Sequence, residues 1–307
     1  MKKSNDLKGK GTAEVTAFAR AAGHRDPVIS NPDFLAQRLL NFRYKLFLIP
    51  GLRHLFLSYY DFKVPGMYLY HQARTIFLDK LFLAAASSVR QIVILGAGFD
   101  TRFYRFADRL KGIRIFEVDH PGTAEWKRQR LHRLGTDTGH VTYATIDFNV
   151  DSLESCLLKH HYDTKAATFF LWEGVVMYLP IESVRKTLSF IADAAPGSSA
   201  AFDYIYASSL ARPRDFTGAE PYYRIVANRN EPCLFGIDPE DMIPFLAEHG
   251  LTVLSHAGPR DLSKLVPPKP LCNFLGIVHA GRNGNTPPRE STVDNSRRET
   301  DRLEDTR

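Results

Sequence analysis

Two glycines and several acidic residues, each placed directly after a short apolar run, suggest a binding site for a ligand that contains a nucleoside. Gly96 and Gly98 follow the run QIVIL, and glycines let a backbone pass close to a ligand. Asp119 ends the next apolar run, 21 residues after Gly98. A carboxylate at that place can accept hydrogen bonds from the two hydroxyls of a ribose.

Position 101 bears on which nucleoside ligand fits the turn. A dinucleotide-binding turn carries a third glycine there, which permits close packing beneath a pyrophosphate, but this chain has Thr101. No set of residues typical of a dehydrogenase accompanies the turn. Both details favour S-adenosyl-L-methionine (SAM), and a tight turn without a ligand is the alternative.

Two further acids could bind other parts of SAM. Asp147, followed by Phe148, closes a third apolar run and offers an acceptor and an apolar surface for the adenine. Glu173 follows six largely apolar residues, where a buried carboxylate is costly unless it has a partner. The ammonium group of SAM is one such partner, and a helix cap or a structural salt bridge is the alternative.

The elements that must position these residues alternate along the chain for nearly 190 residues. This alternation predicts the α/β class, with a doubly wound, mostly parallel sheet covered by helices on both faces. The last two strands follow each other closely, so one of them is expected to lie antiparallel at an edge. The strands are predicted at 91–95, 112–119, 140–148, 166–172, 199–206, 251–257 and 271–280.

The chain is expected to contain three main parts. Residues 1–80 are predicted to form a helical N-terminal lid, and residues 81–280 to form the SAM-binding domain. Within that domain, 206–237 is too long for a simple connection and is predicted to cap the site. Residues 281–307 contain almost no apolar side chains, which predicts a disordered tail.

The composition argues against several classes of protein. No run approaches the roughly 18 apolar residues of a membrane span, and no secretion signal follows the basic start. Three scattered cysteines, Cys156, Cys233 and Cys272, show no metal or disulfide spacing and fit a cytoplasmic protein.

The formal charge is +6. The basic run at 127–135, predicted to be the outer face of a helix, lacks interleaved aromatic residues, so no nucleic-acid partner is expected.

The motifs together resemble those of one known family. The segments ARTIFLD, VILGAGFDTRFYRF, FEVDHP, IDFN and EGVVMYLP occur in this order in the leucine carboxyl methyltransferase family of class I SAM-dependent methyltransferases. The resemblance covers about residues 30–280 and looks closest to a bacterial branch often linked to secondary metabolism. It implies a Rossmann-like methyltransferase sheet, SAM as the methyl donor and S-adenosyl-L-homocysteine as the product.

The resemblance also implies roles for individual residues. Arg74 would bind the SAM carboxylate, and Glu173 would bind the amino group. Arg102 could help to neutralise the carboxylate, and an outward-facing helix arginine is its alternative role. Relatives often carry Asp-Pro-Leu near the start where this chain has NPDFLAQRLL, so no ligand role is assigned there. The other implied SAM contacts are Gly96, Ala97 and Gly98 at the methionine part, Asp119 at the ribose, and Asp147 with Phe148 at the adenine.

Methyl transfer from SAM mainly requires positioning, with the acceptor atom about 3 Å from the methyl carbon. An ionised carboxylate needs no general base, whereas a hydroxyl acceptor does. His71 and Tyr178 are the candidates for a catalytic base or a positioning group, and core packing is the alternative for both. Metal ligands are not indicated.

An aromatic segment points to an apolar acceptor. Residues 42–70 contain nine Phe or Tyr, which could pack on the sheet or cover a lipophilic substrate. The candidate substrate contacts are Tyr59, Tyr60, Tyr68 and Tyr70.

We therefore expect O-methylation, on a carboxylate or a hydroxyl, of a small and rather apolar metabolite. Alternatives are C-methylation of a terpenoid or aromatic product, methylation of a protein or peptide carboxylate, a degenerate SAM fold used only for binding, and a nicotinamide oxidoreductase. A homo-oligomer is compatible with the sequence.

Overall fold

The computed structural model describes residues 10–136, 138–147 and 151–282, and these contain a seven-stranded sheet with the order β3-β2-β1-β4-β5-β7-β6. The five strands β1 to β5 pair in parallel, and β7 is antiparallel to both of its neighbours. The strands are β1 (Gln91–Leu95), β2 (Arg114–Asp119), β3 (Val141–Thr145), β4 (Thr168–Trp172), β5 (Ser199–Ile205), β6 (Leu251–Ala257) and β7 (Leu275–Arg282).

The doubly wound, mostly parallel sheet predicted from the sequence is confirmed, but the expected place of its antiparallel strand is wrong. β7 lies between β5 and β6 instead of at an edge. It pairs with the whole length of β5, from Ser199 opposite Gly281 to Ile205 opposite Leu275. β6 is therefore the edge strand, and its middle residues are only partly buried.

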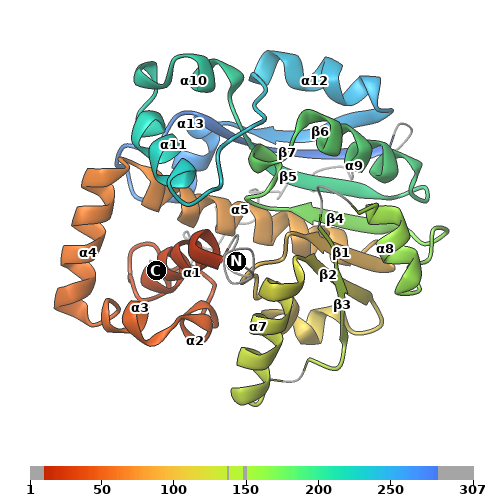
Figure 1. Cartoon of the computed structure of the whole chain (residues 1–307), viewed down its shortest axis with the longest axis horizontal. Helices are drawn as coiled ribbons and strands as arrows, with labels where there is room; N and C mark the ends of the chain where they lie inside the picture. Colours follow the sequence, from red (N-terminus) through yellow and green to blue (C-terminus); the bar gives the residue numbers. More distant parts are fainter. Residues whose placement is uncertain (1–9, 137, 148–150, 283–307) are drawn as a thin grey trace, which may run out of the picture.

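Helices cover both faces of the sheet (Figure 1). The longer ones are α1 (Lys10–His24), α4 (Pro50–Lys63), α5 (Met67–Ala86), α7 (Pro121–Arg133), α8 (Leu153–Lys159), α9 (Ile181–Asp193), α11 (Ala219–Ala227) and α12 (Pro239–Glu248). The shorter ones are α2 (Ala36–Leu39), α3 (Phe42–Leu46), α6 (Arg102–Arg105), α10 (Ala207–Ala211) and α13 (Pro259–Leu262), with 3₁₀ turns at Ala107–Leu110, Val176–Tyr178, Pro213–Asp215 and Ser263–Leu265.

Alternate residues of β1 belong to two separate hydrophobic clusters. Ile92 and Ile94 join the cluster that contains α1, α2 and α5, whereas Val93 and Leu95 join the cluster that contains α8, α9 and α12. All five residues of β1 are buried. Strands buried on both faces are continuous apolar runs, which explains why QIVIL shows no alternation of polar and apolar residues.

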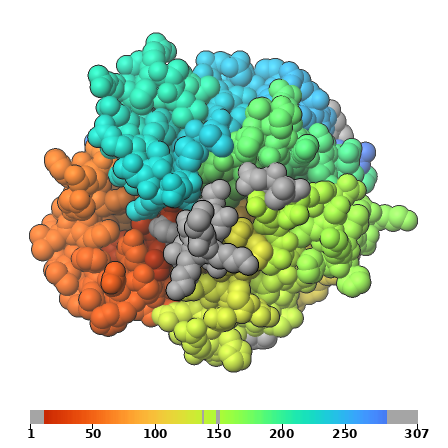
Figure 2. All heavy atoms as spheres, in the orientation of Figure 1, coloured from red at the N-terminus to blue at the C-terminus, as the bar shows by residue number. Residues whose placement is uncertain are grey.

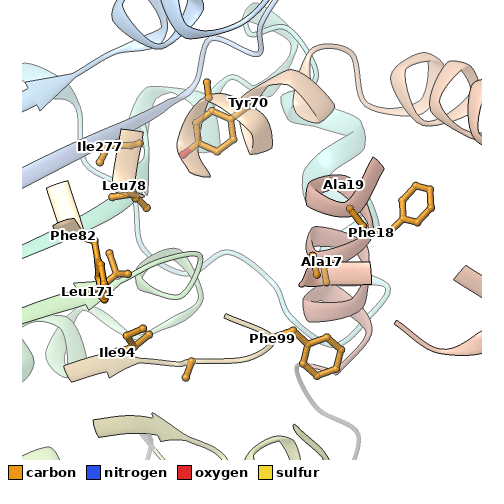
Figure 3. Packing of buried hydrophobic residues seen from close by; sticks show 14 of the residues in the cluster. Ala17, Phe18, Ala19, Tyr70, Leu78, Phe82, Ile94, Phe99, Leu171 and Ile277 are labelled. Carbon is orange, nitrogen blue, oxygen red and sulfur yellow. The ribbon is translucent and has the colours of Figure 1, made fainter. Parts of the chain in front are cut away.

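Helix α5 joins the N-terminal helices to the sheet. Figure 3 shows Tyr70, Leu78 and Phe82 of α5 beside Leu171 of β4 and Ile277 of β7. Because α5 runs to Ala86, the boundary predicted at residue 80 falls inside a helix. The N-terminal helices share one hydrophobic cluster with the sheet, and their action as a lid stays a prediction.

Two other expectations about the ends and surfaces of elements are wrong in detail. β7 continues to Arg282, whose Nη1 donates a hydrogen bond to the Ala194 carbonyl at 3.0 Å, so the predicted tail begins two residues too early. The rest of that tail, 283–307, lies outside the described residues. In the basic run of α7, Lys127 does not face outward. It is 1% exposed and pairs with Glu117 at 2.8 Å.

Every helix within the described part of the chain is too short or too polar to span a bilayer.

Candidate active site

A cavity of about 1080 Å³ lies beyond the carboxyl ends of β1 to β4, at the place where the strand order reverses. Ligands bind at this place in open α/β sheets, and the volume is at the upper end of the range for small-molecule sites. The other walls come from α1, from α4 and α5, and from residues 221–234, which belong to the predicted cap. In Figure 2, α3 and α4 (orange), the 207–237 segment (cyan) and α7 (yellow-green) surround the centre of this face.

The glycine turn after β1 forms one wall of the cavity. Gly96 and Gly98 have φ angles of +63° and +44°, in the left-handed region that favours glycine. A Cβ atom on Gly96 would overlap the side chain of Val175. Asp119 holds the turn, because its two carboxylate oxygens accept from the backbone N–H groups of Gly98, at 2.5 Å, and His120, at 2.6 Å. Burial raises the pKa of Asp119 despite these two hydrogen bonds.

Arg74 and Glu173 meet in the wall of the same cavity. Arg74 Nε lies 2.9 Å from Glu173 Oε1, and Arg74 Nη1 donates to Asp203 Oδ2 at 2.6 Å. Glu173 Oε2 accepts from Arg102 Nη1 at 2.7 Å. Burial by itself would raise the pKa of Glu173, but Arg102 and Arg74 outweigh it and hold that pKa well below its usual range. Glu173 is therefore ionised.

Arg102 is held behind Glu173 instead of facing the cavity. It is 3% exposed, pairs with Asp79 at 2.7 Å and also contacts Asp100. Three carboxylates thus surround one guanidinium, which explains its burial. Arg102 does not line the cavity, and it is not an outward-facing helix residue. The geometry fits a residue that positions Glu173.

The charged cluster extends through further residues that the sequence analysis did not select. Asp33 pairs with Arg20 at 2.7 Å and accepts from Thr101 at 2.7 Å. Arg105 binds Asp79 at 2.7 Å. These contacts tie α1, the segment before α2, and α5 to the turn after β1, so the N-terminal helices are fixed to the site by buried charges.

Helix α1 also reaches the cavity directly, which was not predicted. Thr12, Ala13 and Thr16 line it, and a Cβ atom on Gly98 would lie 3.6 Å from Ala13 Cβ. Arg20 of α1 lines the cavity as well, and the sequence offered no local signal that α1 would reach it.

Part of the cavity wall is aromatic. The hydroxyls of Tyr178 and Tyr222 are 2.7 Å apart, and the Tyr60 hydroxyl lies 3.3 Å from His71 Nε2. Burial, followed by the charge of Arg74, lowers the pKa of His71 well below its ordinary value, so its imidazole is neutral at pH 7. The phenylalanines and tyrosines that line the cavity are Tyr44, Phe56, Tyr59, Tyr60, Tyr70, Phe99, Tyr178 and Tyr222.

Most of the residues predicted from the sequence are thus brought together. Arg74, Gly96, Ala97, Gly98, Asp119, Asp147 and Glu173 line one cavity with His71, Tyr178, Tyr59, Tyr60 and Tyr70. Tyr68 and Arg102 are the exceptions: neither lines this cavity, and the buried hydroxyl of Tyr68 has no hydrogen-bond partner among the described residues. Phe148 lies outside the described residues.

The sequence model of the leucine carboxyl methyltransferase family matches residues 13–192, which is more than half of the chain and includes the glycine turn, Asp119 and Glu173. The chain belongs to the leucine carboxyl methyltransferase family. Family membership confirms the resemblance seen in the motifs.

Curated proteins are similar to this chain over part of their length. YktD of Bacillus subtilis, whose name gives it provisionally as a SAM-dependent methyltransferase, is 30% identical over 179 residues, which are 57% of this chain and 58% of that protein. A protein of Mycolicibacterium smegmatis with the same provisional description is 38% identical over 135 residues, 43% of this chain and 45% of the relative. A third, from Mycobacteroides abscessus, is 32% identical over 63% of this chain and 64% of the relative. The matches thus span only about half to two thirds of the length of these relatives.

Proposed function

We propose that this chain transfers a methyl group from SAM to an oxygen atom of a small, rather apolar acceptor and releases S-adenosyl-L-homocysteine. The observation that supports this most strongly is the continuity of the cavity. The glycine turn, Asp119, the Arg74–Glu173 pair, His71 and several tyrosines all line this one cavity. A donor and an acceptor could therefore lie in contact, as in-line transfer requires.

The cavity wall has the polar groups that SAM requires. The methionine part of SAM carries a carboxylate and an ammonium group, and Arg74 and Glu173 offer the opposite charges beside each other. Asp119 lies at the end of β2 to accept from the ribose, and Asp147 follows β3 on the side expected for the adenine. Because Gly96 and Gly98 have no side chains, the methionine part of SAM can lie close against the backbone of the turn.

A carboxylate is the first candidate for the methylated group. Three cationic residues, Lys63, Arg224 and Arg229, line the cavity and are exposed, so they lie where it opens to solvent. They would attract an anionic acceptor. A carboxylate is already ionised at pH 7 and needs no base. On this reading, His71 and Tyr178 only shape the acceptor site.

A hydroxyl is the second candidate, because of His71. Its neutral imidazole is 7% exposed, its Nε2 faces the Tyr60 hydroxyl, and its buried Nδ1 lacks a hydrogen-bond partner within the described structure. A neutral histidine in the cavity wall could accept the proton of a phenol or alcohol, and such general-base catalysis contributes roughly 10²–10⁴-fold to the rate.

Methyl transfer from labelled SAM to a panel of aromatic carboxylic acids and phenols tests the proposal. A methyl ester releases methanol in mild alkali, whereas a methyl ether or a carbon-bound methyl group does not. We expect an alkali-labile product and a His71→Gln variant whose kcat stays within about threefold of the parent, since a carboxylate needs no base. A His71→Gln loss of about 10²-fold or more with an ether product would assign the hydroxyl. A carbon-methylated product, or no binding of SAM in a calorimetric titration, would overturn the proposal.

A further inference from the structure

An apolar row runs along the outside of α3 and α4. Its seven members follow one another at spacings of three or four residues. Within α3 and within α4 this spacing makes successive side chains neighbours on the helix surface, and Ile49 lies between the two helices. Each is 41–78% exposed. The members are Phe42, Leu46, Ile49, Leu52, Leu55, Tyr59 and Phe62.

Such exposure is unusual for large apolar side chains that are contiguous. Single exposed apolar residues are common on protein surfaces, but contiguous groups mark a surface that binds a partner or a membrane. α3 and α4 stand at the left rim of the face in Figure 2, with α4 at the outer edge of the molecule in Figure 1. Two other residues of α4, Phe56 and Tyr60, are partly buried and pack against the main cluster.

The charge around the row identifies the kind of partner. Segment 42–63 has a single carboxylate, Asp61, and four cationic side chains, Arg43, Lys45, Arg53 and Lys63. Lys63 Nζ lies 5.5 Å from the centre of the Tyr59 ring and 5.8 Å from that of Phe62, so a positive charge flanks the row itself. Apolar side chains bordered by lysine and arginine are typical of helices that lie in the interface of an anionic bilayer.

Other occupants fit less well. A second copy placed face to face would bring two positively charged segments together, and like charges across an interface are costly. The sequence of residues 283–307 offers only Val293 and Leu303 as large apolar side chains, which is too little to cover seven. The first nine residues include three lysines, so they are positively charged, as is segment 42–63, and the two would repel each other.

The row continues into the cavity. Tyr59 is a member of the row and also lines the cavity, and its neighbours Phe56 and Lys63 line it too. An apolar molecule could therefore move from a lipid layer along α4 to the aromatic part of the cavity wall without crossing open water.

We propose that the apolar row docks this protein on an anionic lipid surface, from which its apolar acceptor enters the cavity beside Tyr59. This deepens the proposed function and rests on it for the acceptor, but the docking itself can be measured without any methyl transfer.

Sedimentation of the full chain with lipid vesicles tests the docking. One set of vesicles is phosphatidylcholine alone, and the other contains equal parts of phosphatidylcholine and phosphatidylserine. We expect binding to the mixed vesicles to be at least roughly tenfold tighter, and to weaken as salt is added. A Leu55→Asp, Phe62→Asp double variant should lose about tenfold or more of that binding. An Arg43→Gln, Lys45→Gln double variant should lose the preference for the mixed vesicles.

The matched control is Ile243→Asp on α12, which changes an equally exposed apolar residue, 65% exposed, away from the row. It should bind vesicles as the parent does, and every variant should keep the parent's SAM affinity, which shows that it is folded. Equal binding by the parent and the Leu55→Asp, Phe62→Asp variant, or no binding to either vesicle, would overturn the inference. So would a dimer, seen by light scattering, that the same double variant abolishes. A parent that binds vesicles but not SAM would instead contradict the proposed function.

Discussion

Arg74 and Glu173 are ion-paired in the wall of the cavity, with Nε 2.9 Å from Oε1 and both side chains at most 10% exposed. Each has a further buried partner: Asp203 for Arg74 and Arg102 for Glu173. The pair is therefore part of the fold as well as part of the cavity wall. Variants at these positions should change stability and ligand affinity together.

Glu173→Gln should show this double effect. It removes the negative charge between Arg74 and Arg102, and breaking a buried ion pair by neutralising one partner costs about 3–5 kcal/mol. We expect a fall of that order in the free energy of unfolding, measured in urea, and weaker SAM binding in a calorimetric titration. Glu182→Gln, in the exposed first turn of α9, is the control and should change neither. Parent-like behaviour of Glu173→Gln would show that the pair matters for neither property.

Asp119→Asn should weaken SAM binding, but less than Arg74→Ala does. Asp119 accepts two backbone hydrogen bonds, one on each oxygen, and asparagine must turn its NH₂ group toward one of those donors. Leaving one donor unsatisfied costs about 1–3 kcal/mol, whereas Arg74→Ala leaves Asp203 without its partner arginine and leaves Glu173 with Arg102 alone. Titrations with SAM would rank the two variants. Asp108→Asn, at a highly exposed position with only a surface ion pair, serves as the control. A larger effect for Asp119→Asn than for Arg74→Ala would refute this ranking.

Tyr60 and Tyr68, both predicted substrate contacts, should behave differently. Tyr60 lines the cavity and Tyr68 does not. Tyr60→Ala should raise KM for the acceptor and leave SAM affinity nearly unchanged. Tyr68→Ala should instead lower the free energy of unfolding by about 3 kcal/mol, as expected for a buried aromatic ring. Steady-state kinetics and urea unfolding of both variants separate the two roles, and equal KM effects would contradict the arrangement seen here.

The stability of the protein should fall with acid partly because of His279. Burial lowers the pKa of His279 to about 4, below its ordinary value of about 6.5. As the pH falls from about 6.5 to about 4, the unfolded chain takes up a proton that the folded chain does not, so the free energy of unfolding decreases by at most about 3 kcal/mol. His279→Gln lacks this proton uptake, and its unfolding free energy should depend less steeply on pH in that window. Identical pH profiles for the two proteins would exclude the effect.

Two truncations should have different outcomes. Ending the chain after Arg282 keeps all of β7. We expect this truncated protein to have the same free energy of unfolding and the same SAM affinity as the full chain. Ending it after Ala280 removes the pairing of Gly281 with Ser199 and of Arg282 with Leu251. It also removes the hydrogen bond from Arg282 to Ala194, and at least about 1 kcal/mol of stability should be lost. Thermal unfolding of both truncated proteins measures the difference. Equal stability of the two would contradict the prediction.

The sequence predicted the elements of the fold better than their arrangement. The run QIVIL corresponds residue for residue to β1, because a strand buried on both faces has a local signature. The position of β7 has no such signature, since it depends on which distant strand offers a free edge. Lys127 was misplaced for a similar reason. Its partner Glu117 lies on β2, and a charged residue on a helix gives no local sign that it is buried.

The predicted site also contains some residues that have a local signal in the sequence and others whose partners are distant in the sequence. Glu173 stood out as an acid after an apolar run, and Asp203 could have been found by the same reasoning, since it lies within the run SAAFDYIY. The partners of Arg102 could not have been found in this way. Asp79 is 23 residues away and Glu173 is 71 residues away, so only the folded chain brings them to one guanidinium.

The place of β7 in the sheet has a consequence for synthesis on the ribosome. β5 offers β7 an edge, and within the described chain β6 pairs with β7 alone. Until residues 275–282 leave the exit tunnel, β5 therefore keeps an unpaired edge and β6 has no strand to join. Unpaired edges of this kind pair readily with other chains, so the nascent protein is most exposed to aggregation in the interval between the emergence of β5 and that of β7. Slow translation between residues 206 and 275 would lengthen that interval.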